Sequence, residues 1–517
     1  MSNSARPDNS AGFKNPLSRR SVLKAGAISA VAVGAAVAHE GLSTPTERRN
    51  VRLTASTPVA TGFAAGSQIL YMSSTDRSKT LDIAQGGRAT WIRFDVPWHF
   101  VQPTNSTSYT WDFVDATLND CVARGLKILV SVVGCPAWAA YTTSSTQSRP
   151  ASATTYAAFC KAVATRYKGK INAIEIWNEP NGRLFFQPNP DAAFYTAMLK
   201  AAYASIKATD SSISVIAGAL GPVTNGDGLV MATDFVNTMY ANGAQGSFDA
   251  LSYHPYDYAN TFANSMYYDT SPTRQMISLH SMMKNVGDGG KKIWITEYGA
   301  PTTLLTQDQQ YDLIFNSMRQ WQEVSYAGPM LIYTLRDTNS NGSSDEDRFG
   351  VATSSYVPKK ALYGIEALVR LGFPPREEAT AFAASPDASL GASVGPIYPM
   401  TRGFAYEFEN GARYATYNGF FSSPPAVAAV ARNYRYVPVA PFANDYQDFD
   451  APGGFRVFSR PATTGTHAIY AAILTAWKAN LGFPITDQTT TNGVASVKFE
   501  HGTITWSQAG GTKVTYS

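Results

Sequence analysis

The stretch from Lys127 to Trp177 decides the fold, because it contains two apolar runs separated by an amphipathic segment. The first run is KILVSVV (127–133), the amphipathic segment covers 155–167, and the second run is INAIEIW (171–177). Near-continuous apolar strands are typical of parallel sheets, whose strands are buried on both faces, and a helix-like segment is the usual connection between them. The stretch therefore predicts a strand–helix–strand unit with parallel strands.

Similar apolar runs recur on both sides of this unit, mostly with helix-like segments between them. We expect strands near 62–64 and at 90–94, 214–219, 250–253, 292–296 and 329–335, and helices at 192–208, 308–323 and 360–370. Eight strands alternating with helices over 61–370 predict an α/β fold, a (β/α)8 TIM barrel. A doubly wound open sheet is the alternative, and the absence of a glycine-rich phosphate loop after the first strand disfavours it.

The composition limits the classes of partner. A net charge of +4 over 517 residues, without a basic run, gives no reason to expect nucleic-acid binding. Charged residues make up 15% of the chain and aromatic residues 12%, a balance that suits neutral ligands such as sugars. Cys121, Cys135 and Cys160 form no CxxC pair, and we expect buried free thiols.

The N-terminal 38 residues have the pattern of an export signal. Arg19 and Arg20 precede an apolar run over 25–38 that ends in Ala36-Val37-Ala38, a small-x-small cleavage site. The arginine pair fits a twin-arginine signal, and the run is too short to span a bilayer. We expect a secreted or cell-wall-associated protein without a membrane span after cleavage, with a Thr/Ser/Pro-rich linker over 39–60.

Two expected strands end in glutamates. Glu179 follows the strand at 171–177, and Glu297 follows the strand that begins at Lys292. Catalytic groups of a (β/α)8 barrel lie at the carboxyl ends of its strands, and strands 4 and 7 lie across the mouth from each other. Cleavage of a glycosidic bond needs one protonated carboxyl group and one ionised carboxylate. The pair therefore points to a glycosidase, whereas Glu175, deeper on its strand, is expected to hydrogen-bond in the barrel floor.

The sequences WNEPN (177–181) and ITEYG (295–299) resemble the strand-4 and strand-7 motifs of the retaining (β/α)8 glycoside hydrolases of clan A, near families 5 and 39. The resemblance covers 62–370. It implies that Glu179 is the general acid/base and Glu297 the nucleophile. It also implies four substrate-binding or supporting residues: Asn178 for the sugar 2-hydroxyl, Arg93 in WIRFD beside the nucleophile, and His254 and Tyr256 in SYHPY.

Three aromatic residues are further candidates for sugar binding. Relatives usually carry a tryptophan on strand 8 as a sugar platform, but this chain offers Tyr333 there, which leaves the type of sugar open. Trp98 and Trp138, each just past a strand end, are candidate stacking residues, with packing in the core as the alternative for each.

We expect no metal or other cofactor. The segment Asp337-Thr338-Asn339-Ser340-Asn341-Gly342 begins like a calcium loop, but its twelfth position is Arg348, where a bidentate glutamate is needed. An Asn/Gly-rich surface loop is therefore the better interpretation. No metalloprotease, esterase or phosphate-loop motif is present.

The segment 371–517 is rich in Gly, Pro and aromatic residues with short alternating runs, a pattern that predicts a separate, mostly β module. Leu371-Gly372-Phe373-Pro374 recurs at Leu481–Pro484, and Phe408-Glu409-Asn410-Gly411 recurs as FEHG at 499–502. The module resembles LGFP repeats, more closely after Gly453 than before it, and the number of repeats is left open. The resemblance implies attachment to cell-wall polysaccharide, although a β module that merely packs on the barrel is an alternative.

Together these features predict an exported, retaining glycosidase that acts on a polysaccharide or glycoconjugate, with the cell envelope as the expected location. The alternative is a non-catalytic carbohydrate-binding or structural wall protein on a barrel scaffold. The sequence leaves the sugar, the linkage and the choice between endo and exo action open.

Overall fold

The computed structural model describes residues 57–143 and 145–517. The predicted twin-arginine signal and most of the predicted linker lie outside the described residues. Within the described ranges, no helix is both long enough and apolar enough to cross a membrane.

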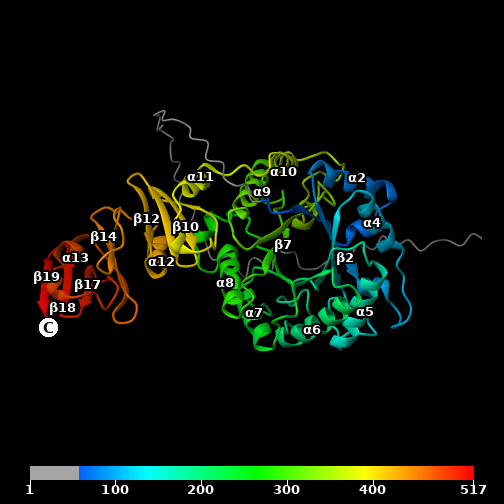
Figure 1. The fold of residues 1–517 in the computed structure, drawn as a ribbon, viewed down its shortest axis with the longest axis horizontal. Coiled ribbons are helices and arrows are strands. Elements are labelled where there is room, and N and C mark those ends of the chain that lie inside the picture. Colours follow the sequence, from blue (N-terminus) through cyan, green and yellow to red (C-terminus); the bar gives the residue numbers. More distant parts are fainter. Residues whose placement is uncertain (1–56, 144) are drawn as a thin grey trace, which may run out of the picture.

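Eight parallel strands close into a barrel in chain order (Figure 1). The first strand pairs with the second and also with the eighth, so the sheet has no open edge, and the expected (β/α)8 barrel is confirmed over the open sheet. The strands are β1 Thr61–Ala64, β2 Trp91–Pro97, β3 Lys127–Val133, β4 Ala173–Ile176, β5 Ser214–Leu220, β6 Ala250–Tyr253, β7 Lys292–Tyr298 and β8 Ala327–Tyr333.

Helices follow the strands around the outside of the barrel. Several helices are preceded by a Ser, Thr or Asp whose side chain accepts a hydrogen bond from a backbone N–H of the first turn. These N–H groups have no acceptor within the helix itself, so the capping side chain supplies one. The helices are α2 Ser74–Gly86, α4 Asp112–Ala123, α5 Ala153–Arg166, α6 Ala192–Thr209, α7 Ala232–Ala241, α8 Pro272–Asn285, α9 Gln307–Trp321 and α10 Lys360–Arg370, and short turns η1 Gln68–Tyr71, α3 Trp98–Val101, η2 Asn264–Tyr267 and η3 Asp345–Asp347 lie in the loops.

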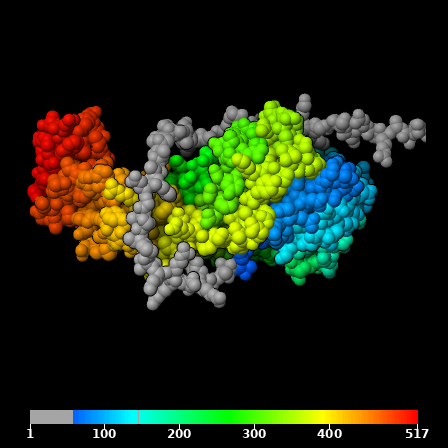
Figure 2. All heavy atoms as spheres, turned by 90° about the horizontal axis from the view of Figure 1, so that it is seen from above, coloured from blue at the N-terminus to red at the C-terminus, as the bar shows by residue number. Residues whose placement is uncertain are grey.

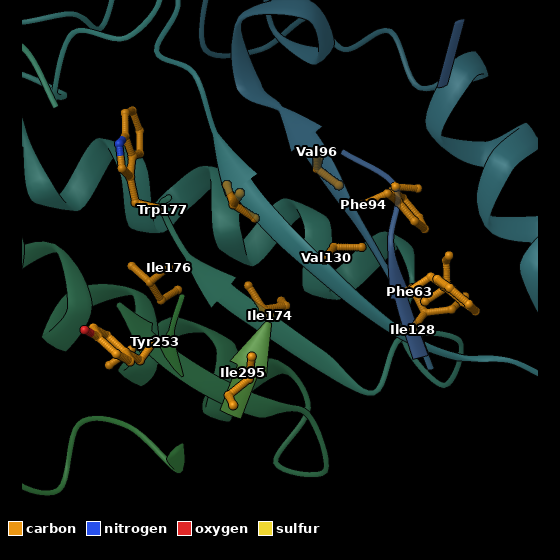
Figure 3. Close-up of a cluster of buried hydrophobic side chains, with 14 of the residues drawn as sticks. Phe63, Phe94, Val96, Ile128, Val130, Ile174, Ile176, Trp177, Tyr253 and Ile295 are labelled. Carbon is orange, nitrogen blue, oxygen red and sulfur yellow. The ribbon is translucent and has the colours of Figure 1, made fainter. Parts of the chain in front are cut away.

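The two faces of each barrel strand have different roles. Outward-facing side chains such as Phe94, Val130 and Ile174 pack beneath the helices (Figure 3). Inward-facing side chains form a small apolar floor in which Trp91 and Trp294 meet edge to face, 5.1 Å apart. Polar residues follow this floor toward the carboxyl ends of the strands. The apolar side chains that stabilise the barrel therefore lie apart from the polar side chains that can take part in a reaction. The three cysteines are buried and free, as predicted.

The C-terminal module consists of three small antiparallel sheets and extends away from the barrel (Figures 1 and 2). Helix α12 lies against both the first and second sheets, and helix α13 against both the second and third. The elements are α11 Glu377–Ala384, η4 Ala388–Leu390, β9 Tyr398–Met400, β10 Gly403–Phe408, β11 Gly411–Thr416, β12 Gly419–Ser423, α12 Pro425–Tyr434, β13 Tyr446–Phe449, β14 Phe455–Arg460, β15 Gly465–Tyr470, α13 Ala471–Ala476, η5 Ala479–Leu481, β16 Thr489–Thr491, β17 Val494–Phe499, β18 Gly502–Ser507 and β19 Gly511–Tyr516.

The three sheets are three copies of one unit. The same bridge joins the start of each unit to the last residue of the first strand of its hairpin: Ser393 to Phe408, Pro438 to Phe449, and Pro484 to Phe499. A backbone hydrogen bond follows each bridge one residue further on, from Val394, Val439 and Ile485 respectively. The module is therefore built from three equivalent units, although the sequence repetition is visible in only part of it.

This equivalence corrects one pairing made from the sequence. Leu481-Gly482 corresponds in space to Leu390-Gly391, since both pairs end a short 3-10 helix and both glycines lie against the glutamate of the following hairpin. Leu371-Gly372 instead ends α10, where Gly372 adopts φ 68° just past the helix end. The recurrence of LGFP at 371 is therefore a helix terminus and not the start of a repeat.

The first unit packs directly on the barrel. Arg376 donates two hydrogen bonds to Glu323 at the end of α9, at 2.6 and 2.7 Å, and Tyr326 donates to the Val394 carbonyl at 2.8 Å. Met266 of the β6–α8 loop belongs to the apolar core of this unit. The module thus shares a buried interface with the barrel.

Candidate active site

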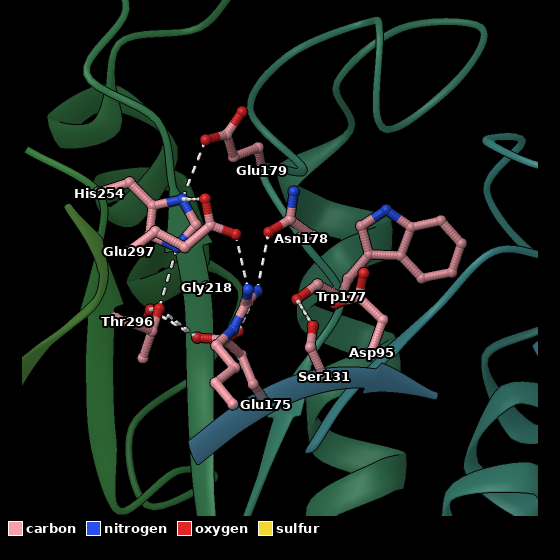
Figure 4. Close-up of polar contacts among 12 residues, drawn as sticks. Asp95, Ser131, Glu175, Trp177, Asn178, Glu179, Gly218, His254, Thr296 and Glu297 are labelled. Carbon is pink, nitrogen blue, oxygen red and sulfur yellow. Dashed lines mark hydrogen bonds and ion pairs between the residues drawn. The ribbon is translucent and has the colours of Figure 1, made fainter. Parts of the chain in front are cut away.

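The carboxyl ends of β2, β4, β6 and β7 bring six of the predicted site residues together. Figure 4 labels Asn178, Glu179, His254 and Glu297 among them. The six residues are Arg93, Asn178, Glu179, His254, Tyr256 and Glu297. All are buried or nearly so except Asn178, which is half-buried. The site therefore lies at the mouth of the barrel, where strand-end groups can meet a ligand from solvent.

Arg93 is the central cation of the site. Its guanidinium donates to Glu297 Oε1 at 2.6 Å, to Glu175 Oε2 at 2.7 Å and to Asn178 Oδ1 at 2.9 Å. Burial alone would lower the pKa of Arg93, but the charges of Glu175 and Glu297 outweigh burial and raise it. Arg93 is therefore always charged, and it holds Glu297 in place while orienting the amide of Asn178.

Glu175 anchors this arrangement from below. It is fully buried and accepts hydrogen bonds from Arg93, from Ser252 at 2.7 Å and from Thr296 at 2.8 Å. These bonds confirm the prediction that Glu175 belongs to the barrel floor. A buried carboxylate with this many donors is compensated by its partners.

Glu179 and Glu297 have different partners. Glu179 Oε1 lies 2.9 Å from His254 Nδ1, whereas Glu297 accepts from Arg93 and from the Tyr256 hydroxyl, the latter at 2.8 Å. His254 Nδ1 lies 3.9 Å from Glu297 Oε2. Because both distances are measured from the same nitrogen, Glu179 Oε1 and Glu297 Oε2 are less than about 7 Å apart. The separation of about 5–5.5 Å between the carboxyl groups of retaining glycosidases falls inside this limit. Most of the range of about 6.5–9.5 Å found in inverting glycosidases lies outside it.

The position of the proton on His254 depends on the hydroxyl groups beside the ring. Thr296 Oγ1 lies 2.8 Å from Glu175 Oε1, 2.6 Å from Ser252 Oγ and 2.9 Å from His254 Nε2. When the single hydroxyl proton of Thr296 is donated to Glu175, Nε2 of the ring donates to Thr296. In that tautomer the lone pair of the neutral imidazole lies on Nδ1 and faces Glu179, which can donate a hydrogen bond to it when protonated.

Backbone irregularities at two strand ends turn the catalytic segments toward the mouth. Regular alternation from Glu175 would place Trp177 in the site, but Trp177 adopts φ 71° and its ring packs outward in the core, where its Nε1 donates to the Phe185 carbonyl. Asn178 and Glu179 consequently both face the mouth. In β7 a register shift between Ile295 and Tyr298 lets the adjacent Thr296 and Glu297 both contact the site.

The three aromatic candidates lie in three different environments. Trp98 is fully buried, stacks on Phe159 with ring centres 5.4 Å apart and donates to Gln102, so this residue packs in the core and offers no face to a sugar. Trp138 is partly exposed and donates to the Gln102 carbonyl. Tyr333 is partly exposed at the end of β8, where its hydroxyl donates to Glu346 at 3.3 Å.

The structure adds Asp95 to the site. Asp95 lies two residues after Arg93 on the same face of β2 and accepts from Ser67 at 3.2 Å. Burial raises the pKa of Asp95, the charge of Arg93 opposes this rise, and Glu297 and Glu175 add to it. The i,i+2 spacing from Arg93 in WIRFD was the available signal for this residue. Ser252 and Thr296 had no such signal, because hydroxyl residues are common on barrel strands.

The segment that begins like a calcium loop is held by protein groups. The Asp337 carboxylate accepts from Lys359 at 2.8 Å and from the backbone N–H of Gly350 at 2.9 Å. Across residues 57–143 and 145–517, no group of three or more His, Cys, Asp or Glu side chains is arranged to hold a metal ion.

Comparison with known proteins identifies the family. Residues 55–328, more than half of the chain, match the family model for cellulase, glycosyl hydrolase family 5, and the chain belongs to this family. It is therefore a glycoside hydrolase, and the resemblance inferred from WNEPN and ITEYG is confirmed. Residues 481–517, the third unit of the module, match the LGFP repeat.

The similar solved structures are distant from this chain in sequence. A family 39 glycoside hydrolase from Bacteroides cellulosilyticus is 16% identical with a TM-score of 0.48, over 81% of this chain and 80% of that one. A GH5_18 protein from Bifidobacterium longum is 14% identical with a TM-score of 0.48, over 60% and 79%. An exo-β-1,4-mannosidase from an Opitutaceae bacterium is 18% identical with a TM-score of 0.43, over 62% and 61%. No curated protein sequence matches the chain.

Proposed function

We propose that this protein is a retaining glycosidase in which Glu297 is the nucleophile and Glu179 the general acid/base. The observation that carries the proposal is the unequal environment of the two carboxyl groups. Arg93 and Tyr256 donate to Glu297, which favours its ionised form, whereas His254 Nδ1 can accept a hydrogen bond from protonated Glu179. The limit on their separation also supports retention.

The reaction follows from these roles. Glu297 attacks the anomeric carbon while Glu179 gives its proton to the departing oxygen, so the glycosidic bond breaks and a glycosyl ester of Glu297 forms. A water molecule then gives a proton to the Glu179 carboxylate and attacks the same carbon, which releases the sugar and restores Glu297. Arg93 orients Asn178, the group that by its motif binds the 2-hydroxyl of the sugar.

The anomeric configuration of the first product tests the retaining assignment. Proton NMR during hydrolysis of aryl β-glycosides should show the β-anomer first, followed by slow mutarotation. Initial release of the α-anomer would refute the double displacement. A screen across aryl glucosides, mannosides and xylosides, and then across wall polysaccharides, would identify the sugar.

We also propose that the protein is exported by the twin-arginine route and held at the cell wall by residues 371–517. The export proposal is supported by the pattern at 1–38, and the wall proposal by the LGFP match and the three equivalent units. Cell fractionation tests both: replacing Arg19 and Arg20 by Lys should retain the protein inside the cell, and removing 481–517 should reduce the fraction bound to isolated walls.

A further inference from the structure

Three aromatic side chains lie together on the surface near the first two strands of the barrel. Tyr71 is 47% exposed, Phe100 42% and Phe113 51%. The ring centre of Tyr71 lies 5.3 Å from that of Phe100 and 5.9 Å from that of Phe113. We call these three residues the aromatic patch.

The aromatic patch belongs to the same end of the barrel as the catalytic groups. Tyr71 ends η1, which follows β1, and Phe100 lies in α3, which follows β2 directly. Phe113 lies in the first turn of α4, the helix that follows α3. All three are therefore carried by segments that leave the carboxyl ends of strands, where a (β/α)8 barrel places its ligand-binding loops.

Contacts connect the patch to the catalytic groups. Asp95 follows Arg93 on the inner face of β2, and its carboxylate accepts a hydrogen bond from Ser67, the residue just before η1. Burial and the charge of Asp95 raise the pKa of Tyr71 to about 12. A chain of contacts thus links Glu297 on β7 through Arg93 and Asp95 on β2 to the segment that carries Tyr71.

The chemistry of the patch indicates what it can bind. Clustered aromatic rings left in contact with water usually mark a binding surface, because their burial by a ligand is favourable. The neighbouring His99, whose ring centre lies 4.6 Å from that of Phe100, has a pKa lowered by burial and is uncharged at neutral pH. An uncharged aromatic surface suits the C–H faces of neutral sugars.

We propose that the aromatic patch binds further units of a neutral pyranose chain whose reacting unit lies between Glu179 and Glu297. The proposal rests on the proposed function and deepens it, since it assigns a polysaccharide or long oligosaccharide as the substrate class. The C-terminal module lies at the opposite end of the molecule from the first barrel strands (Figure 2), so it does not supply or cover this surface.

Binding and catalysis can be tested separately. Glu297→Gln would prevent turnover, and calorimetry with this variant would measure binding of cellohexaose, β-1,4-mannohexaose and β-1,4-xylohexaose and of the three disaccharides. Phe100→Ala with Phe113→Ala should weaken the best-bound hexaose by about tenfold and its disaccharide much less. In the active enzyme, the same pair of changes should lower kcat/KM for that hexaose and leave an aryl monoglycoside unchanged.

Tyr363→Ala is the control, because Tyr363 is an aromatic residue on α10 that is even more exposed, at 64%, and lies outside the patch. It should change neither binding nor turnover. Equal binding of every hexaose by the patch variant and its parent would overturn the proposal. So would a failure of all three hexaoses to bind the parent, or gel filtration that shows a dimer lost in the patch variant with sugar binding intact. Hexaose binding without any hydrolysis by the wild type would overturn the proposed function and leave the patch supported.

Discussion

His254 Nδ1 lies 2.9 Å from Glu179 Oε1, and the opposite nitrogen of the ring is committed to Thr296. When the Thr296 hydroxyl donates to Glu175, ring Nε2 donates to Thr296, and Nδ1 can accept a hydrogen bond from protonated Glu179. This relationship makes the position of the acid proton depend on hydroxyl groups deeper in the barrel.

Replacing His254 with Phe should keep the volume of the ring and remove both hydrogen bonds. We expect slower cleavage of substrates with poor leaving groups, which need the proton of Glu179, and a smaller effect on activated aryl glycosides. Comparing kcat/KM across a leaving-group series measures this difference. An equal loss on all leaving groups, with an unchanged melting temperature, would contradict the assignment.

The two glutamates should respond differently to truncation. Glu297→Ala should abolish turnover, and azide should restore some activity with an inverted product. Glu179→Ala should slow poor leaving groups by about 10²–10⁴-fold while sparing good ones, and azide should give a retained glycosyl azide. Product configuration by NMR separates the two cases. No rescue at either position, with equal losses on all substrates, would refute the roles.

Arg93 should contribute to stability as well as to catalysis. Arg93→Met leaves Glu175 and Glu297 buried without their cation, so the free energy of unfolding should fall by about 3–5 kcal/mol. Arg88→Met is the control, because water screens the solvent-exposed Arg88–Glu366 pair and its loss should change stability much less. Denaturant unfolding measures both, and equal losses for the two variants would contradict the buried arrangement.

The interface between the barrel and the module should be sensitive to acid. Burial would raise the pKa of Glu407, but Arg274 at 2.7 Å and Arg432 at 2.8 Å outweigh it and lower that pKa. A lowered pKa stabilises the fold above the unfolded value of about 4.3, and this contribution is lost as the pH falls through the folded value. Glu407→Gln should therefore be less stable at pH 7 and lose less melting temperature on acidification, which calorimetry at several pH values would reveal. If the melting temperature of Glu407→Gln fell with pH as steeply as that of the wild type, the proposed contribution of Glu407 would be contradicted.

Removing the module should affect the barrel according to where the chain is cut. A chain ending at Arg370 loses Arg376 and Tyr398 and uncovers Glu323, so its barrel should melt at a lower temperature. A chain ending at Asn480 keeps the first unit and should keep the stability of the barrel and its kcat on small glycosides. Loss of small-substrate activity in the second chain would indicate that the distal unit contributes to the site.

Much of the barrel could be predicted because apolar runs and strands coincide. The predicted strand at Lys127–Val133 and the predicted helix at Lys360–Arg370 match the structure at both ends. Periodicity could not reveal how strands end. The left-handed backbone of Trp177 sends that ring outward, and nothing in WNEPN distinguishes it from a side chain that faces the sugar.

The sequence also could not predict which single aromatic residues are buried. Trp98 and Trp138 both follow strand ends, yet Phe159 of α5 covers only Trp98, and that contact depends on tertiary packing. The repeat register was misjudged at Leu371 because the same Leu-Gly pair serves to end a helix and to begin a unit. Local sequence gives identical signals for the two uses.

The contact between Arg93 and Glu297 joins residues 204 positions apart, on strands that are distant in the chain. Contacts of such long sequence separation form late in folding, since a long loop must close before they contribute. The chemical machinery thus comes into existence only when the barrel has closed on itself. During synthesis, a partly folded chain still holds Arg93 apart from Glu175 and Glu297, and it has no means of cutting a sugar.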